Sequence, residues 1–325
     1  MNKAQKITSI CFGIFFALLG IVLLFWYFGD SYPTFYANAE KEFEVAGLED
    51  GFTPQGLCYE ENSKTFLSSG YMKDGSASRI YVIDGEEGKT TKYFTLNNGE
   101  EDYSGHAGGI ATDGTNVWIV GDGYLFRFMF ADIELVENGD SIDIIDGFKT
   151  GNGADFITVE ENFLWVGEFH KDGKYDTDES HHIETENSTN KAIHFCYEIN
   201  SANEYGIKST TPVKALSTGS LVQGMEITTN KIILSTSYSL PNSHIYIYEN
   251  IFTTAEETFD YNGTPIDLYV LEEVNLLEDI EAPCMSEELA IADGRVYVLF
   301  ESACKKYGMV TREALKHVYS LDIEI

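Results

Sequence analysis

A short pattern of strand, tight turn and strand recurs five times in this 325-residue chain, and it constrains the fold more than any other feature. The copies align without gaps when they are anchored on their second apolar position. Each first strand is followed by a polar turn, such as Asp293-Gly294, of residue types that tolerate positive φ in hairpins. A second apolar strand comes next, so the chain is expected to be all-β. The first strands begin Gln55-Gly-Leu-Cys-Tyr, Gly108-Gly-Ile-Ala-Thr, Asp155-Phe-Ile-Thr-Val, Gln223-Gly-Met-Glu-Ile and Glu287-Glu-Leu-Ala-Ile.

A further strand follows the hairpin in each copy. Strand, hairpin and strand in succession resemble the blade of a β-propeller, which is a small four-stranded antiparallel sheet. The chain beyond residue 40 gives about 57 residues per blade for five blades and about 47 for six, against about 40 to 45 in compact blades. Because five copies are present, the sequence predicts a five-bladed propeller, with six blades as the alternative. A β-sandwich is the other all-β alternative, but it does not explain the recurrence.

The resemblance is to the propeller class as a whole and covers nearly all of the chain after the first forty residues. The chain is also somewhat similar to the calcium-dependent lactonase and esterase-like propellers, although it carries no catalytic motif specific to one family. The segment around Phe43 precedes the first copy as an unpaired strand, and the chain ends inside a blade at residues 317–323. We expect the N-terminal strand to complete the last blade, because this closes the ring by hydrogen bonds.

The N-terminal segment from Ile7 to Phe28 contains no charged residue and is long enough to cross a hydrocarbon core of roughly 30 Å. Lys3 and Lys6 precede it and Asp30 follows it, which predicts a cytoplasmic N-terminus. A cleavable signal peptide with a small-residue site near residues 37–39 is the alternative. The predicted organisation is a cytoplasmic terminus at 1–6, a transmembrane signal-anchor helix at 7–28, a tether at 29–42 and an extracellular propeller at 43–325.

The balance of 21 basic and 53 acidic residues gives a net charge of −32, which argues against nucleic acid as a partner. The expected partners are the lipid bilayer, through residues 7–28, and a small molecule or protein at the propeller. The sequence has no serine nucleophile elbow, P-loop, dinucleotide-binding glycine motif or C-x-x-C motif. A serine triad, nucleotide hydrolysis and redox cofactor chemistry therefore have no support.

The repeat alignment predicts where a site lies, because in a propeller the first strand of each blade begins, and the second ends, at the same mouth of the central channel. Two rings of side chains are expected there, one from each set of strand ends. The starts of the first strands contribute Gln55, Gly108, Asp155, Gln223 and Glu287, with His106 nearby, and the ends of the second strands contribute Gly70, Asp122, Glu168, Ser237 and Glu301. The predicted ligand-binding residues are Gln55, His106, Asp122, Asp155, Glu168, Gln223, Glu287 and Glu301.

Crowded carboxylates repel one another unless a cation or a raised pKa relieves the repulsion. One interpretation is a cation site, with Ca²⁺ as the expected ion and Asp155, Glu168, Glu287 and Glu301 as ligands. The other is a metal-dependent hydrolase acting on a lactone, ester, phosphoester or glycoside, with Glu168, Glu301, Asp155 and His106 as catalytic candidates. A third alternative is that these groups only line a water-filled channel. Whether the chain is an enzyme is left open.

Two loops between second and third strands are long and should lie at the same mouth. The loop at 170–190 contains the adjacent His181 and His182 among several carboxylates, and its spacing favours a solvated acidic loop over a transition-metal site. The loop at 302–316 carries Lys305, Lys306 and Arg312, which could contact an anionic group of a ligand.

The cysteines outside the first helix are expected to include one disulfide. Cys284 and Cys304 flank the last hairpin at nearly equal distances from its turn, which predicts a bridge between antiparallel strands. Cys58 and Cys196 fall inside strands of different blades and are expected to be buried free thiols.

Overall fold

The computed structural model describes residues 3–27, 32–99, 101–253, 255 and 257–324. The chain divides into two compact units, Met1–Pro33 and Thr34–Ile325. The first unit contains helix α1 (Lys3–Tyr27), at the position of the predicted anchor helix. Within the part of the chain that is described, no helix is both long and apolar enough to span a bilayer. Residues 28–31, where the predicted helix meets the predicted tether, lie outside the described residues.

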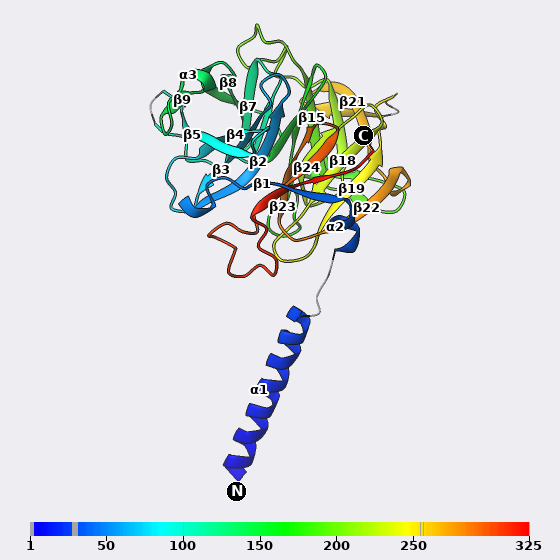
Figure 1. Cartoon of the computed structure of the whole chain (residues 1–325). Helices are drawn as coiled ribbons and strands as arrows, with labels where there is room; N and C mark the ends of the chain where they lie inside the picture. Colours follow the sequence, from blue (N-terminus) through cyan, green and yellow to red (C-terminus); the bar gives the residue numbers. More distant parts are fainter. Residues whose placement is uncertain (1–2, 28–31, 100, 254, 256, 325) are drawn as a thin grey trace. The chain divides into compact units, whose positions relative to one another are not determined.

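The second unit contains five large, mainly antiparallel sheets, and each corresponds to one copy of the sequence repeat (Figure 1). This confirms the five-bladed propeller and removes the six-bladed and sandwich alternatives. From the channel outward, the strands of the first three blades are β2 (Phe52–Glu60), β3 (Thr65–Met72), β4 (Arg79–Asp84) and β5 (Lys89–Asn97), then β6 (Gly109–Thr112), β7 (Asn116–Gly121), β8 (Tyr124–Met129) and β10 (Ile145–Lys149), then β11 (Phe156–Glu160), β12 (Phe163–Gly167), β15 (Ala192–Glu198) and β16 (Lys214–Thr218).

The fourth and fifth blades complete the ring. Their strands are β17 (Val222–Ile227), β18 (Lys231–Thr236), β19 (Ser243–Glu249) and β22 (Leu276–Ala282), then β23 (Ser286–Ala292), β24 (Arg295–Phe300), β25 (His317–Leu321) and β1 (Ala39–Glu44). The short helices are α2 (Pro33–Asn38), α3 (Asp132–Leu135), η1 (Leu48–Asp50), η2 (Glu179–His181) and η3 (Glu273–Asn275). Two strands of two residues each, β13 (Ile183–Glu184) and β14 (Thr189–Asn190), pair with each other in the 170–190 loop.

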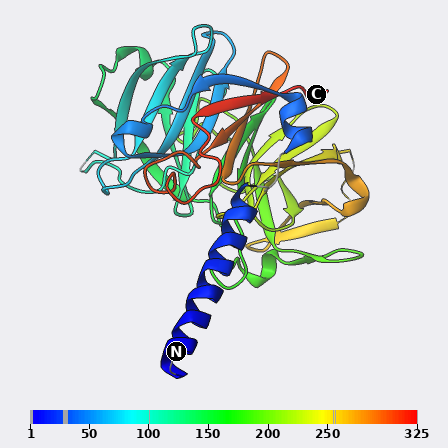
Figure 2. The ribbon, with the colours of Figure 1, turned by 60° about the horizontal axis from the view of Figure 1, so that its bottom comes forward.

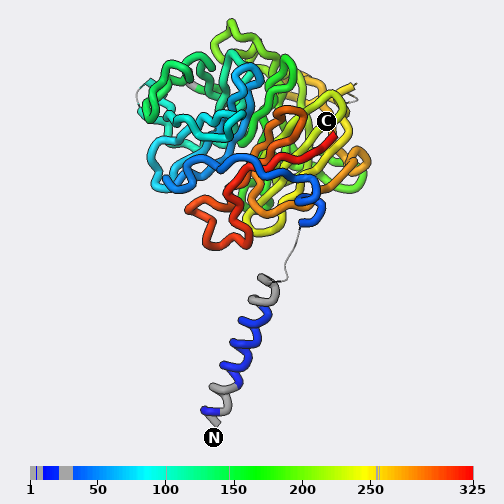
Figure 3. The backbone as a smooth tube through the Cα atoms, in the orientation of Figure 1, coloured from blue at the N-terminus to red at the C-terminus, as the bar shows by residue number. Residues whose placement is uncertain are grey.

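The N-terminal strand closes the ring, as the sequence predicted. Strand β1 pairs antiparallel with β25, so that Ala39 lies opposite Leu321. The blue β1 and the red end of the chain run side by side in Figures 1 and 3. The last blade therefore has four strands although its own repeat supplies only three.

Two blades carry additional outer strands that the repeat pattern did not predict. Strand β9 (Ser141–Asp143) comes from the second repeat but pairs parallel with β5 of the first blade. The hairpin of β20 (Glu257–Tyr261) and β21 (Thr264–Val270) comes from the fourth repeat, and its β21 pairs parallel with β16 of the third blade. Each segment covers the open edge of the preceding blade, so it blocks edge-to-edge pairing with another chain.

The hydrophobic core lies between neighbouring blades. Trp118 of β7 is fully buried and packs in a cluster with residues of the third blade such as Phe195. Trp165 of β12 packs in the same way against the fourth blade, in a cluster with Leu234. Each blade is thus stabilised mainly by burial against its neighbours, as expected when a small sheet cannot bury both faces alone.

The predicted disulfide is wrong: Cys284 and Cys304 are both buried free thiols, as are Cys58 and Cys196. The antiparallel pairing of the last hairpin ends where the Glu301 N–H donates to the Met285 carbonyl oxygen. The chain then turns, because the Cys304 N–H donates back to the Glu301 carbonyl oxygen. Cys304 therefore lies in a turn and is not a cross-strand partner of Cys284. The turn begins the long red loop that Figure 2 shows after β24.

Candidate functional site

A cavity of about 480 Å³ lies at the mouth where the first strands of the blades begin. All five blades contribute to its lining, which is the arrangement that the repeat alignment predicted. Seven of the eight predicted ligand-binding residues line it: Gln55, His106, Asp122, Asp155, Gln223, Glu287 and Glu301. We call this cavity the acidic mouth.

Glu168 is the predicted residue that does not line the acidic mouth. Its carboxylate is buried and accepts hydrogen bonds from His181 Nδ1 at 2.8 Å and from the Ile193 N–H at 2.9 Å. His181 is itself buried, although the sequence placed it in a solvated loop. Glu168 therefore anchors the 170–190 loop and is not among the side chains that line the acidic mouth.

Three of the four residues that the sequence predicts as Ca²⁺ ligands, Asp155, Glu287 and Glu301, line the acidic mouth. Glu168 does not line it, although it lies close enough to Asp155 for its charge to raise the pKa of that group. Among the described residues, the ligand atoms that lie within 4.8 Å of one another form one group, His170, Asp172 and Asp176. Lys191 Nζ lies 2.5 Å from the Asp172 carboxylate in this group and supplies a positive charge there. The calcium site at the acidic mouth stays a prediction.

Glu287 and Glu301 form a carboxyl pair at the acidic mouth, where their side chains hydrogen bond to each other. Burial raises the pKa of both groups, and the adjacent Glu301 charge raises that of Glu287 further. The Gln55 amide Nε2 donates to Glu301 Oε2 at 3.1 Å, and the charge of Lys306 lowers the pKa of Glu301. A carboxyl–carboxyl hydrogen bond requires one proton, so the pair holds a shared proton and one negative charge.

Asp155 and His106 are two further titratable groups of the acidic mouth. Burial raises the pKa of Asp155 to about 7, although its Oδ2 accepts a hydrogen bond from the Phe169 N–H at 2.7 Å. Burial lowers the pKa of His106, whose Nε2 donates to Gln55 Oε1 at 2.6 Å. Gln55 therefore connects the imidazole of His106 to the carboxyl pair.

The walls of the acidic mouth are aromatic and carry two lysines, features that the sequence reasoning mostly missed. Lys306 Nζ lies 4.9 Å from the ring centroid of Tyr71 and 4.8 Å from that of Tyr307. Lys174 Nζ donates to the Tyr238 hydroxyl at 2.9 Å. The repeat alignment held a signal for part of this wall, since Tyr71, Phe169 and Tyr238 each directly follow a residue that the alignment places at the mouth, namely Gly70, Glu168 and Ser237.

The backbone before the first strands adopts a left-handed conformation in four of the five blades. The residues with positive φ are Ala107, Ala154, Leu221 and Met285, with values of 47°, 49°, 70° and 65°. Non-glycine residues rarely adopt this region, and such residues cluster at functional sites. Ala154, Leu221 and Met285 lie one or two residues before Asp155, Gln223 and Glu287, whose side chains line the acidic mouth, and Ala107 directly follows His106, which also lines it.

Glu288 closes the channel below the acidic mouth. Its carboxylate accepts hydrogen bonds from the backbone N–H groups of Leu57, Ile110 and Ile157, at 2.9, 3.0 and 2.9 Å. Burial raises the pKa of Glu288, while these three donors oppose the shift. One side chain of the fifth blade thus ties together the inner strands of the first three blades.

The close approach of Glu288 accounts for the glycines of the repeat. A Cβ atom at Gly56 would lie 3.0 Å from Glu288 Oε2, and one at Gly109 would lie 2.8 Å from Oε1. A Cβ atom at Gly224 would lie 2.6 Å from the Glu288 Cα. These positions are glycine because the axis of the propeller is too crowded for a side chain.

No family model and no curated protein matches the chain. Among solved structures, it is similar to the glutaminyl cyclase of Myxococcus xanthus, at 12% identity and a TM-score of 0.46, covering 87% of this chain and 95% of that one. It is also similar to a putative oxidoreductase (glucose dehydrogenase) from Thermus thermophilus, at 11% identity and a TM-score of 0.43, covering 87% and 99%. At this level of similarity, neither structure bears on the function of the chain. The finer similarity to calcium-dependent lactonases stays a prediction.

Proposed function

We propose that the chain binds a small polar ligand at the acidic mouth. The observation that carries this proposal is the convergence of all five blades on one cavity that holds a carboxyl pair, two lysines and several tyrosine rings. The ligand is expected to present hydroxyl or amine donors to Glu301 and Gln55. An anionic group on the same ligand would face Lys306, and tyrosine rings would cover its apolar surfaces.

A hydrolase function is the second candidate, and the Glu287–Glu301 hydrogen bond favours it. Two carboxyl groups that share one proton can activate water: the charged one accepts a proton from water, and the protonated one donates its proton to the carbonyl oxygen under attack. The two groups are in hydrogen-bond contact, so they lack the spacing of about 5 Å or more that glycosidases use. Esters and lactones are therefore favoured over glycosides as substrates.

The proposed location is the outer face of a cell membrane, with the N-terminus in the cytoplasm. The support is the uncharged segment Ile7–Phe28 and the lysines before it. Alkaline carbonate extraction of the full chain from cells tests the anchor, which predicts retention in the membrane fraction. Protease added to intact cells should then remove the propeller and leave residues 1–6 protected.

The ligand proposal is tested with the full chain in a thermal-shift screen of small polar compounds at pH 7, together with an ester and lactone hydrolysis screen. The binding proposal is supported if a compound binds the wild type and the E301Q variant no longer binds it. The hydrolase function is supported if the wild type hydrolyses a substrate and both E287Q and E301Q abolish turnover. E278Q is the matched control, because Glu278 is an exposed carboxylate on the outer strand β22.

Parallel screens with Ca²⁺ or chelator test the cation interpretation, which predicts a chelator-dependent melting temperature.

A further inference from the structure

A second cavity, of about 510 Å³, lies at the other end of the channel. Its lining comes from the ends of the inner strands, whereas the acidic mouth is lined from their beginnings. The apolar lining side chains that are only half-buried are Tyr59, Val159 and Ile291. Glu288 lies between the two cavities, because its carboxylate is bound to the N–H groups of Leu57, Ile110 and Ile157. We call this second cavity the lower cavity.

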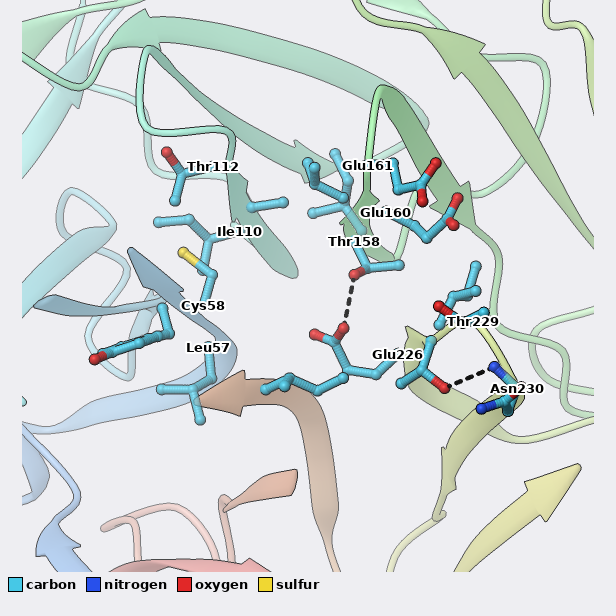
Figure 4. A pocket seen from close by; sticks show the side chains of 17 residues that line it. Leu57, Cys58, Ile110, Thr112, Thr158, Glu160, Glu161, Glu226, Thr229 and Asn230 are labelled. Atoms are coloured by element: carbon cyan, nitrogen blue, oxygen red, sulfur yellow. Dashed lines mark hydrogen bonds between the residues drawn. The ribbon is translucent and has the colours of Figure 1, made fainter. Parts of the chain in front are cut away.

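One carboxyl group projects into the lower cavity. Figure 4 shows Glu226 of β17 among the lining side chains, with its carboxyl group directed toward Thr158. The Thr158 hydroxyl donates to Glu226 Oε2 at 3.2 Å. Burial raises the pKa of Glu226 to about 8, since hydrogen bonds from the Thr158 hydroxyl and the Ile227 N–H compensate only in part for the lost hydration of a charge.

The charged residues that line the lower cavity are all acidic. Glu160 and Glu161 lie at the rim of the lower cavity, and the described lining residues include no lysine, arginine or histidine. Glu288 and Cys58 are the titratable groups that interact with Glu226 from the neighbouring strands, and the charge of Glu226 raises the pKa of both. The cavity therefore combines apolar side chains with a lining whose charged groups are all negative, and this combination is complementary to an apolar cation.

We propose that the lower cavity binds a compact organic cation, with an ammonium group against the Glu226 carboxylate and a small apolar body against Tyr59, Val159 and Ile291. Binding of the cation removes the proton from Glu226 and releases it to solvent. At a pH below the pKa of Glu226, one proton is released for each cation bound. The ammonium charge then compensates the carboxylate that burial otherwise disfavours. Thr158 keeps its hydrogen bond to the ionised form and orients it.

Choline is a suitable probe, because its quaternary ammonium group does not titrate and 3,3-dimethylbutan-1-ol is its uncharged isostere. Isothermal titration calorimetry of the full chain with choline should show one binding site. The affinity should rise about tenfold per pH unit from pH 6 toward 8 and then level off, because cation binding competes with a single proton. The uncharged alcohol should bind at least tenfold more weakly at pH 8 and show no such dependence.

The E226Q variant should lower the choline affinity at least tenfold and remove its pH dependence, whereas E278Q should leave both unchanged. The wild-type pH profile keeps the test informative if E226Q fails to fold. Equal binding of choline and the alcohol, undiminished binding by E226Q or no saturable binding would overturn the proposal. Loss of binding in E301Q with retention in E226Q would place the cation at the acidic mouth instead and would also overturn it.

Discussion

His181 donates a hydrogen bond from Nδ1 to Glu168 Oε1 at 2.8 Å, and both side chains are buried. This contact joins the end of the second strand of the third blade to the 170–190 loop. It also explains why one of the five predicted mouth carboxylates is missing from the acidic mouth. The loop at 170–190 is therefore an anchored wall of the cavity, to which it contributes Lys174 and Tyr175.

Replacing His181 by alanine should lower the free energy of unfolding by about 2 kcal/mol, because a buried carboxylate loses a hydrogen-bond donor. Replacing the adjacent His182, which is only half-buried, should cost less. Urea denaturation of the two variants measures the difference. Equal stability of H181A and H182A would contradict the anchoring role of this contact.

Replacing Glu288 by glutamine, its amide isostere, should lower the stability of the protein. The variant E288Q replaces one acceptor oxygen by an NH₂ group that faces the backbone N–H donors of Leu57, Ile110 or Ile157. At least one buried N–H would lose its partner, at a cost of roughly 1–3 kcal/mol. Thermal denaturation of E288Q beside E278Q measures the loss, and a melting temperature equal to that of the control would show that the hydrogen bonds are not needed.

Stability should fall as the pH rises from about 5 to 8. Asp155, with its pKa raised to about 7, and Glu226, with its pKa raised to about 8, retain protons in the folded state that they lose in the unfolded state. The folded state binds more protons over this range, so each group lowers the free energy of unfolding by up to about 1.4 kcal/mol per pH unit. The variants D155N and E226Q should flatten the profile. A wild-type profile that is flat or rises between pH 5 and 8 would contradict the raised values.

The four cysteines of the propeller should react as thiols only after unfolding. Cys58, Cys196, Cys284 and Cys304 are all buried and free. Reductant should therefore leave the melting temperature unchanged, and iodoacetamide should modify these residues in denaturant but not in buffer. Intact-mass measurement counts the modified thiols, and a mass that shows two unreactive cysteines after unfolding would restore the disulfide.

The blade number and most of the acidic mouth could be predicted because they repeat, and the closing strand because the last repeat lacks a fourth strand. A repeated hairpin fixes which ends of its strands meet at the channel, so aligned positions such as Asp155 and Glu287 could be placed together without any knowledge of the loops. The repeat could not place Glu168 correctly, since its partner His181 comes from an insertion found in one blade only.

The remaining errors arise from contacts between segments far apart in the sequence. The disulfide prediction assumed that the last hairpin extends to Cys304, but the chain turns at Glu301. The outer strands β9 and β21 join the preceding blade, so no pattern within a single repeat indicates them. Glu288 and Glu226 were similarly hidden, because adjacent residues of a strand face opposite sides and only the axis packing shows which ones enter the channel.

The most direct test of the acidic mouth is a thermal-shift comparison between the wild-type chain and the double variant E287Q/E301Q across one library of small polar compounds. The account predicts that at least one compound stabilises the wild type by several degrees at concentrations well above its Kd, while the double variant shows no shift. A compound that shifts both proteins equally, or a library that shifts neither, would contradict a ligand site built on the Glu287–Glu301 pair.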